Sequence, residues 1–247
     1  VVAMIIIGGI TRITDSGLSM VEWRPFLGLL PPLNNQEWER VFDLYKNTPE
    51  YSFYNKGMLL SEFKFIFFWE YFHRLWGRII GIVFIIPFIY FIVTKKIDKF
   101  ITIRLFVILF FGSLQAFIGW WMVKSGLIDK PDVSQYRLAI HLGNSLLILF
   151  LLFWLILDLK NKKSRIKFDL NLIIFFIIFV TIIAGSLVAG MDAGLMYNTY
   201  PLMNDSFFPS DYLSLGLLDP FENPGSAQFH HRHCLLYTSP SPRDGQI

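Results

Sequence analysis

The feature that most constrains this chain is a series of four apolar stretches, each long enough to cross a lipid bilayer. A hydrocarbon core of roughly 30 Å requires about 20 consecutive apolar residues in a helix. The stretches run over residues 64–93, 101–123, 138–157 and 168–190. Because a helix satisfies its own backbone hydrogen bonds in lipid, these stretches predict an all-α integral membrane protein.

The composition agrees with a bilayer environment. Charged residues make up 17% of the 247 residues, whereas soluble domains carry about a quarter. The net charge of +3 is too small to indicate a nucleic-acid partner, and the basic residues gather in short loops. The single cysteine excludes an internal disulfide and a cysteine-based zinc site. Membrane lipid is therefore the expected surrounding.

The loops between the stretches differ in charge, which predicts their orientation. Residues 94–104 and 158–169 are short and basic, so the positive-inside rule places them on the cytoplasmic or matrix side. Residues 14–63 and 191–227 are longer and net acidic, so we expect them on the outer side. Within the first outer loop, the string NNQEWERVFDLYK predicts a short helix with Asn35 as its N-cap.

Two further segments predict incomplete spans. Residues 1–13 are apolar but have neither a basic start nor a cleavage site. We therefore expect them to be the outer part of a truncated first helix rather than a signal peptide. Another span is expected to begin near Gln228.

Short strings recur along the chain in the same order. Residues 15–20 read DSGLSM and residues 192–197 read DAGLMY, each after a span. Residues 70–74 read EYFHR and residues 228–232 read QFHHR, each at the outer end of a span. Two matches in one order predict a duplicated helical bundle whose halves are related by an axis along the membrane normal.

The repeat predicts how the chain divides. Gly8 matches Gly185 at the same distance before the two loop strings. If each half holds four helices, residues 1–160 form the N-terminal four-helix half. Residues 161–233 then form the start of a C-terminal four-helix half, so five to six of eight helices are represented.

Polar residues near the outer ends of two spans carry the candidate chemistry. Glu70 and His73 lie three residues apart and therefore share one helix face. His141 lies at a comparable depth in a different span. Because two imidazoles at one level can ligate both faces of a haem iron, we expect His73 and His141 to bind haem. The alternative for either histidine alone is an interhelical hydrogen bond.

Basic residues at the same level are candidate partners for haem propionates. They are Arg74, Arg78 and Arg137. The alternative is that these arginines extend to the membrane surface or set the topology. Gln115, in the third stretch, is interpreted as a helix-packing residue rather than a ligand.

The two copies of the histidine string differ at one position. The first has Glu70 where the second has Gln228. A carboxylate can exchange protons or stabilise a cation, whereas an amide can only form hydrogen bonds. We therefore expect the first site to react and the second, with His231, to hold a cofactor.

Six strings together resemble one known family. They are GGITRITDSGLSMVEW, EYFHRLWGR, LQAFIGWWMVKSGL, VSQYRLAIHL, AGMDAGLMYNTYPLM and FENPGSAQFHHR. They cover nearly all of residues 1–232 in order. On these motifs the chain resembles the mitochondrial-type class of the cytochrome oxidase assembly and haem A synthase family.

The resemblance implies an oxidoreductase of eight helices in two halves, which oxidises the C8 methyl of haem O to the formyl of haem A for terminal oxidase assembly. It implies that His73 and His141 bind the substrate haem, that Glu70 has the catalytic acidic role, and that His231 ligates a haem b. The other class has a cysteine pair in the first outer loop. This chain has none there, so a thiol-based electron relay is not implied.

The resemblance also bears on location and partners. It is compatible with the bacterial inner membrane and with the mitochondrial inner membrane. Haem O synthase is an expected partner, and a homo-oligomer is an open alternative. Because the partner helix of His231 is absent from the given chain, that chain by itself is expected to be inactive.

Two other functions compete with haem A synthesis. One is a bis-histidine membrane cytochrome that acts only in electron transfer, against which Glu70 and the motifs speak. The other is a secondary transporter. It is disfavoured because the spans show neither paired broken helices nor a polar cluster at the midplane.

The last residues of the chain do not continue the sixth span. After His230, His231, His233 and Cys234, which do not share one helix face, the chain turns to Ser, Pro and Gly. The string CLLYTSPSPRD is also the translation of a nucleotide string that resembles a transposase-type sequencing adapter. We therefore predict that residues 234–247 are read-through and lie outside the fold.

Overall fold

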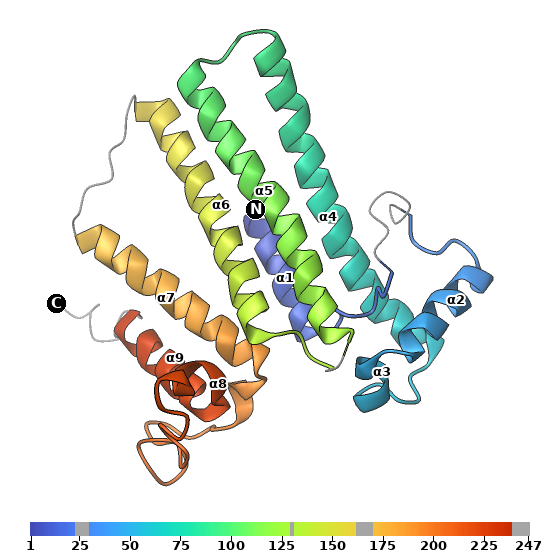
Figure 1. The fold of residues 1–247 in the computed structure, drawn as a ribbon, viewed down its shortest axis with the longest axis vertical. Coiled ribbons are helices and arrows are strands. Elements are labelled where there is room, and N and C mark those ends of the chain that lie inside the picture. The colour runs from blue at the N-terminus through green and yellow to red at the C-terminus, as the bar shows by residue number, and fades with distance from the viewer. Residues whose placement is uncertain (23–29, 129–130, 162–169, 239–247) are drawn as a thin grey trace, which may run out of the picture. The chain divides into compact units, whose positions relative to one another are not determined.

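The computed structural model describes residues 1–22, 30–128, 131–161 and 170–238 (Figure 1). Within these ranges the chain is helical, apart from loops and an isolated bridge between Met203 and Ser206. In order, the elements are α1 (Val2–Ile13), α2 (Asn35–Lys46), α3 (Pro49–Phe53), α4 (Leu60–Val93), α5 (Lys99–Gly126), α6 (Gln135–Asn161), α7 (Leu170–Gly190), η2 (Ala193–Leu195), η3 (Gly216–Leu218), α8 (Asp219–Glu222) and α9 (Pro224–Thr238).

Four of these helices, α4 to α7, are long and apolar enough to cross a bilayer. They correspond to the four predicted spans, although residues 168 and 169 of the last one lie outside the described ranges. The prediction of an all-α integral membrane protein is confirmed. The shorter apolar helix α1 corresponds to the incomplete first span, and α9 to the one predicted near Gln228.

Helix α4 is longer than the sequence predicted. It begins at Leu60, and its 34 residues correspond to about 51 Å at the usual rise of 1.5 Å per residue. This exceeds the roughly 30 Å of a hydrocarbon core, so α4 extends past the bilayer. Its first turn is held by the backbone N–H of Leu59, which donates to Oε2 of Glu62 at 2.7 Å.

Aromatic packing explains why the N-terminal end of α4 stays helical. Buried residues of α2 and α4 form one cluster: Phe42, Tyr45, Phe63, Ile66 and Phe67. The rings of Phe42 and Phe63 stack with their centroids 4.9 Å apart. Burial of each large apolar side chain stabilises the contact by about 1.5–3 kcal/mol. The segment between α1 and α4, which we expect on the outer side, therefore contains a helix packed on α4.

The N-cap of α2 differs from the prediction by one residue. Asn34 caps the helix, because its Oδ1 accepts a hydrogen bond from the backbone N–H of Glu37 at 2.8 Å. Asn35, which we predicted as the cap, is instead the first helical residue. In a pair of adjacent asparagines, the cap is the one whose side chain reaches the third helical residue, and sequence alone leaves both positions open.

The chain divides into two compact units, and each is described by itself. Unit 1 comprises residues 1–134 and 144–163, and unit 2 comprises residues 135–143 and 164–247. In unit 1, α4 packs against α1, α2 and α5. In unit 2, α9 packs against α7, α8 and η2. The division into halves at residues 160 and 161 stays a prediction.

A polar cluster joins α5 to α6 within unit 1. Nδ2 of Asn144 donates to Oε1 of Gln115 at 2.6 Å, and Nε2 of Gln115 donates to Oγ of Ser145 at 2.6 Å. Gln115 is therefore a helix-packing residue, as predicted. The sequence does not show that these three side chains converge, and the expectation that the spans lack a polar cluster at the membrane midplane stays a prediction. Since they satisfy one another, the cluster stabilises packing.

In unit 2, a buried carboxylate organises the loop that leads into α9. The Asp219 side chain is fully buried and accepts from the backbone N–H groups of Leu213, at 2.9 Å, and Leu215, at 3.2 Å. Asn223 donates to Asp219 at 3.3 Å and accepts from the backbone N–H of Ser226 at 3.2 Å. These contacts fix the start of α9, the helix that carries His231.

Helix α9 continues to Thr238, past the boundary predicted before Cys234. Residues 239–247, which make up most of the predicted read-through, lie outside the described ranges. The origin of residues 234–247 stays a prediction.

Candidate functional site

Glu70 lies on α4 and is 3% exposed. Its Oε2 accepts hydrogen bonds from Oγ of Ser19 and from the backbone N–H of Met20, each at 2.7 Å. Its Oε1 forms an ion pair with Arg74, one turn further along α4. Nη2 of Arg74 also donates to the carbonyl oxygen of Met20 at 3.2 Å. Together these contacts fix the loop that follows α1 to the side of α4.

His73 lies between these two residues and faces α1. A β-carbon added to Gly8 of α1 would lie 3.2 Å from Cε1 of the imidazole, so the ring packs directly on the helix backbone. Nδ1 of His73 is buried without a hydrogen-bond partner among the described residues, and so is Nη1 of Arg78 on the same helix. A buried polar atom without a partner costs about 1–3 kcal/mol. Both atoms are therefore candidates for a hydrogen bond to a polar ligand.

Gln228 occupies the corresponding place on α9. Its Oε1 accepts from the backbone N–H of Tyr197 at 3.1 Å, and its Nε2 donates to the carbonyl oxygens of Gly194, at 2.9 Å, and Tyr197, at 3.1 Å. Nη2 of Arg232 donates to the same Tyr197 oxygen at 2.9 Å. The loop that follows α7 is therefore fixed to α9.

His231 lies between Gln228 and Arg232 and faces α7. A β-carbon on Gly185 would lie 2.8 Å from Cε1 of its imidazole. Nδ1 of His231 lies 3.1 Å from the carbonyl oxygen of Thr181. With Nδ1 as the donor, Nε2 keeps the lone pair that a metal requires.

The repeat in the sequence is therefore a repeat of contacts. In each copy a helix glycine contacts the imidazole, a loop residue bonds the side chain three positions before the histidine, and an arginine follows the histidine. Asp15 and Asp192, which open the two loops, share the left-handed backbone conformation, with φ of 46° and 50°. Aspartate is among the few residues that adopt this conformation readily.

His141 and Arg137 lie on the first part of α6, which belongs to unit 2, and each interacts with another residue. His73 lies in unit 1. The pairing of His73 with His141 therefore stays a prediction, as does the contact of Arg137 with a propionate. Of the other predicted propionate partners, Arg74 already bonds Glu70 and Met20, whereas Nη1 of Arg78 has no hydrogen-bond partner among the described residues.

Sequence reasoning missed the partners of these residues. Ser19, Met20 and Tyr197 hold Glu70 and Gln228, and the carbonyl of Thr181 orients His231. Met20 and Tyr197 are the last residues of the two repeated loop strings, so the repeat could have identified these two residues as partners. The bond to a backbone carbonyl leaves no signal in a sequence.

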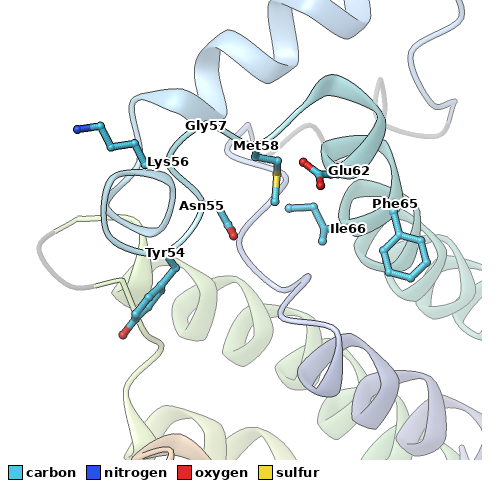
Figure 2. Close-up of a pocket in the computed structure, with 8 residues that line it drawn as sticks. All are labelled: Tyr54, Asn55, Lys56, Gly57, Met58, Glu62, Phe65 and Ile66. Atoms are coloured by element: carbon cyan, nitrogen blue, oxygen red, sulfur yellow. The ribbon is translucent and has the colours of Figure 1, made fainter.

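A metal-binding cluster and a surface pocket would be other candidate sites, and neither involves the predicted histidines in the described part of the chain. No group of three or more His, Cys, Asp or Glu suited to a metal ion occurs in the part of the chain that the structure describes, the histidines of α9 included. A surface pocket of about 490 Å³ lies where the α3–α4 turn meets the start of α4, and Figure 2 shows the residues that line it. Residues 54–58, Glu62, Phe65 and Ile66 line it. None of the predicted site residues lies there.

Comparison with known proteins decides the family. A model of the cytochrome oxidase assembly protein family (COX15-CtaA) matches residues 1–238. The chain belongs to this family. The resemblance inferred from the six motifs is confirmed at this level, because the family match includes both histidine helices.

Individual relatives in the family are named haem A synthase. One from Nitrosospira multiformis is 46% identical over 94% of this chain and 68% of its own length. One from Wolbachia pipientis wMel is 46% identical over 96% of this chain and 70% of its own length. One from Pelagibacter ubique is 47% identical over 94% of this chain and 70% of its own length. No solved structure matches the chain.

Proposed function

We propose that this protein is a haem A synthase, a membrane oxidoreductase that converts haem O into haem A. The observation that carries the proposal is the 44–48% identity to proteins of that name along nearly the whole chain. The conversion of a methyl to a formyl group requires two successive two-electron oxidations. The site must therefore hold a haem and exchange electrons and protons with it.

His231 fits the role of a haem b ligand. With Nδ1 donating to the Thr181 carbonyl, the ring orientation is fixed and Nε2 carries the lone pair that an iron ligand needs. The close approach of Gly185 leaves the imidazole in one place. Haem b, when bound, supplies one-electron transfer, and its potential depends on the axial ligand and on hydrogen bonding around it.

His73 and His141 are the proposed ligands of the substrate, haem O. The support comes from α4, where Nδ1 of His73 and Nη1 of Arg78 are buried without partners among the described residues. A haem propionate can form charge-assisted hydrogen bonds with Arg78. Arg137 is a further candidate for the propionates, whereas Arg74 already bonds Glu70 and Met20.

Glu70 is the proposed catalytic residue. Three donors, from Ser19, Met20 and Arg74, hold its carboxylate in place. We propose that it acts as a fixed negative charge beside the substrate haem, which stabilises positive charge that develops during oxidation. Its engagement by three donors speaks against a mobile proton carrier.

The experiment that tests this function is identification of the haem in the protein expressed from its complete reading frame together with haem O synthase. The expected result is haem B accompanied by haem O or haem A. Haem B alone, with no conversion of added haem O, would instead establish the alternative, a bis-histidine cytochrome that acts only in electron transfer.

The proposed location is the bacterial or mitochondrial inner membrane, with residues 94–104 and 158–169 on the cytoplasmic or matrix side. The four apolar helices and the basic composition of these loops support this orientation. Reporter fusions at Lys96 and at Lys124 should give opposite sides. A homo-oligomer and a contact with haem O synthase belong to the same proposal and can be tested by co-purification.

A further inference from the structure

The two histidine helices are tied to their loops by equivalent sets of hydrogen bonds. The first loop anchor consists of Met20, Glu70 and Arg74, and the second loop anchor consists of Tyr197, Gln228 and Arg232. In both, the backbone N–H of the loop residue donates to the side chain before the histidine. Its carbonyl oxygen accepts from the arginine after the histidine.

Each loop anchor connects the two helices between which an imidazole lies. The loop of Met20 continues from α1, which carries Gly8, and the loop of Tyr197 continues from α7, which carries Gly185. Both anchoring side chains flank the histidine, at three residues before and one after. Because a helix turns by 100° per residue, contacts within one turn of the histidine fix the rotation and height of its ring.

We infer that Arg74 and Arg232 are positioning residues, which hold His73 against Gly8 and His231 against Gly185 through the two loop anchors. This inference rests on the proposed ligation of haem by these histidines. In this inference, Arg74 positions His73 and does not contact a haem propionate. The guanidinium of Arg232 donates in addition to the carbonyl oxygens of Thr199, at 2.8 Å, and Leu202, at 3.4 Å. The acceptors of these Arg232 bonds are backbone carbonyl oxygens.

Comparison of the two loop anchors distinguishes the hydrogen-bonding role of the Glu70 side chain from the role of its charge. The amide of Gln228 forms the same bond to the loop N–H that the carboxylate of Glu70 forms. By analogy with Gln228, Glu70→Gln should retain the bond from the Met20 N–H and lose the ion pair with Arg74, whereas Glu70→Ala removes both contacts. A role of Glu70 in positioning and a role of its charge in catalysis thus predict different results for the two variants.

The second loop anchor is tested with haem b titrated into the detergent-purified, full-length protein. Arg232→Ala should weaken haem b binding by about tenfold, the lower end of what loss of a supporting contact costs a metal site. It should also alter the low-spin bis-histidine signal in the electron paramagnetic resonance spectrum. Arg232→Lys, which retains one donor, should restore part of both.

Arg40→Ala is the matched control. Arg40 forms ion pairs with Glu22 and Glu37 and belongs to neither loop anchor, so its loss should leave haem binding unchanged. An Arg232→Ala protein with wild-type haem b affinity and a wild-type spectrum would overturn the inference. If Arg232→Ala is not recovered from membranes, Arg232→Lys is measured in its place. A wild-type spectrum and wild-type haem b affinity of Arg232→Lys would also overturn the inference.

The first loop anchor is tested by the binding spectrum of added haem O. Glu70→Gln should bind haem O as the wild type does, and Glu70→Ala should bind it about tenfold more weakly. Equal binding by the two variants would contradict the inference. These readouts do not require turnover, so a protein that holds haem b but makes no haem A would refute the proposed function and leave this inference standing.

Discussion

Gly185 lies so close to His231 that a β-carbon on the glycine would be 2.8 Å from Cε1 of the imidazole. Real β-carbons do not approach another atom so closely, so the ring or the helix must move if any side chain is present. Gly185→Ala is therefore expected to displace His231 and weaken haem b binding by about tenfold. Titration of the purified protein with haem, followed by its visible spectrum, measures this.

Glycines of α1 provide the comparison. Gly8 approaches His73 less closely, at 3.2 Å for the corresponding β-carbon, so Gly8→Ala should have a smaller effect on haem O binding. A β-carbon on the neighbouring Gly9 would meet no atom within 4 Å, so Gly9→Ala should have no effect. A reversed order of Gly8→Ala and Gly9→Ala would contradict the close packing of His73 on α1.

Glu70→Gln should slow the conversion of haem O without weakening its binding. The variant is expected to keep haem O but to form haem A about 100-fold more slowly, the loss typical for removal of one preorganised electrostatic group. Chromatographic quantification of haem O and haem A over time measures the rate. Conversion at the wild-type rate would exclude a catalytic role for the charge.

Glu50 should make the stability of the outer loop depend on pH. Its carboxyl is 5% exposed, and burial raises its pKa from 4.5 to about 8, opposed by a hydrogen bond from Tyr45 at 2.9 Å. Since the folded pKa is above the unfolded one, the stabilisation is fully present below pH 4.5 and is lost as the pH rises through about 8. Protease cleavage between α2 and α4 should therefore accelerate from about pH 6 to about pH 9.

Glu50→Gln is the control for this titration. The amide has nearly the same shape and stays neutral, so the cleavage rate should lose most of the pH dependence that remains after correction for the protease. An unchanged pH dependence in Glu50→Gln would assign it to another group.

Asp219 should respond to pH in the opposite direction. Burial opposes its charge, but hydrogen bonds from the backbone N–H groups of Leu213 and Leu215 and from the Asn223 side chain help to outweigh burial, and the pKa is lowered from 3.8 to about 2. The stabilisation is therefore present above pH 3.8 and is lost as the pH falls through about 2. Asp219→Ala should loosen the loop before α9 already at neutral pH, seen as faster amide hydrogen exchange at Leu213 and Leu215. Exchange at the wild-type rate would contradict this role.

The features predicted correctly from the sequence are those that depend on the local pattern of residues. Hydropathy located the four spans because a bilayer requires a minimum apolar length, and the recurring strings located both histidine helices. The N-terminal end of α4 was missed because its helicity depends on packing against α2. The cap at Asn34 and the converging Gln115 and Asn144 depend on geometry that spacing does not determine.

The candidate site was predicted in its residues but not in its contacts. Glu70 and Gln228 stood out because one repeat position differs in charge. Their loop partners, and the carbonyl that orients His231, depend on how two helices meet. The pairing of His73 with His141 stays a prediction.

The length of α4 has a mechanical consequence. One uninterrupted helix carries the aromatic cluster at Phe63, the carboxylate of Glu70 and the imidazole of His73, and then continues to Val93. A helix resists stretching and twisting over two or three turns, so a protein that bound the outer loop and rotated Phe63 would also rotate His73. Binding of a protein to residues 30–59, which precede the first long apolar helix, could therefore change the position of His73, the residue proposed to ligate haem O.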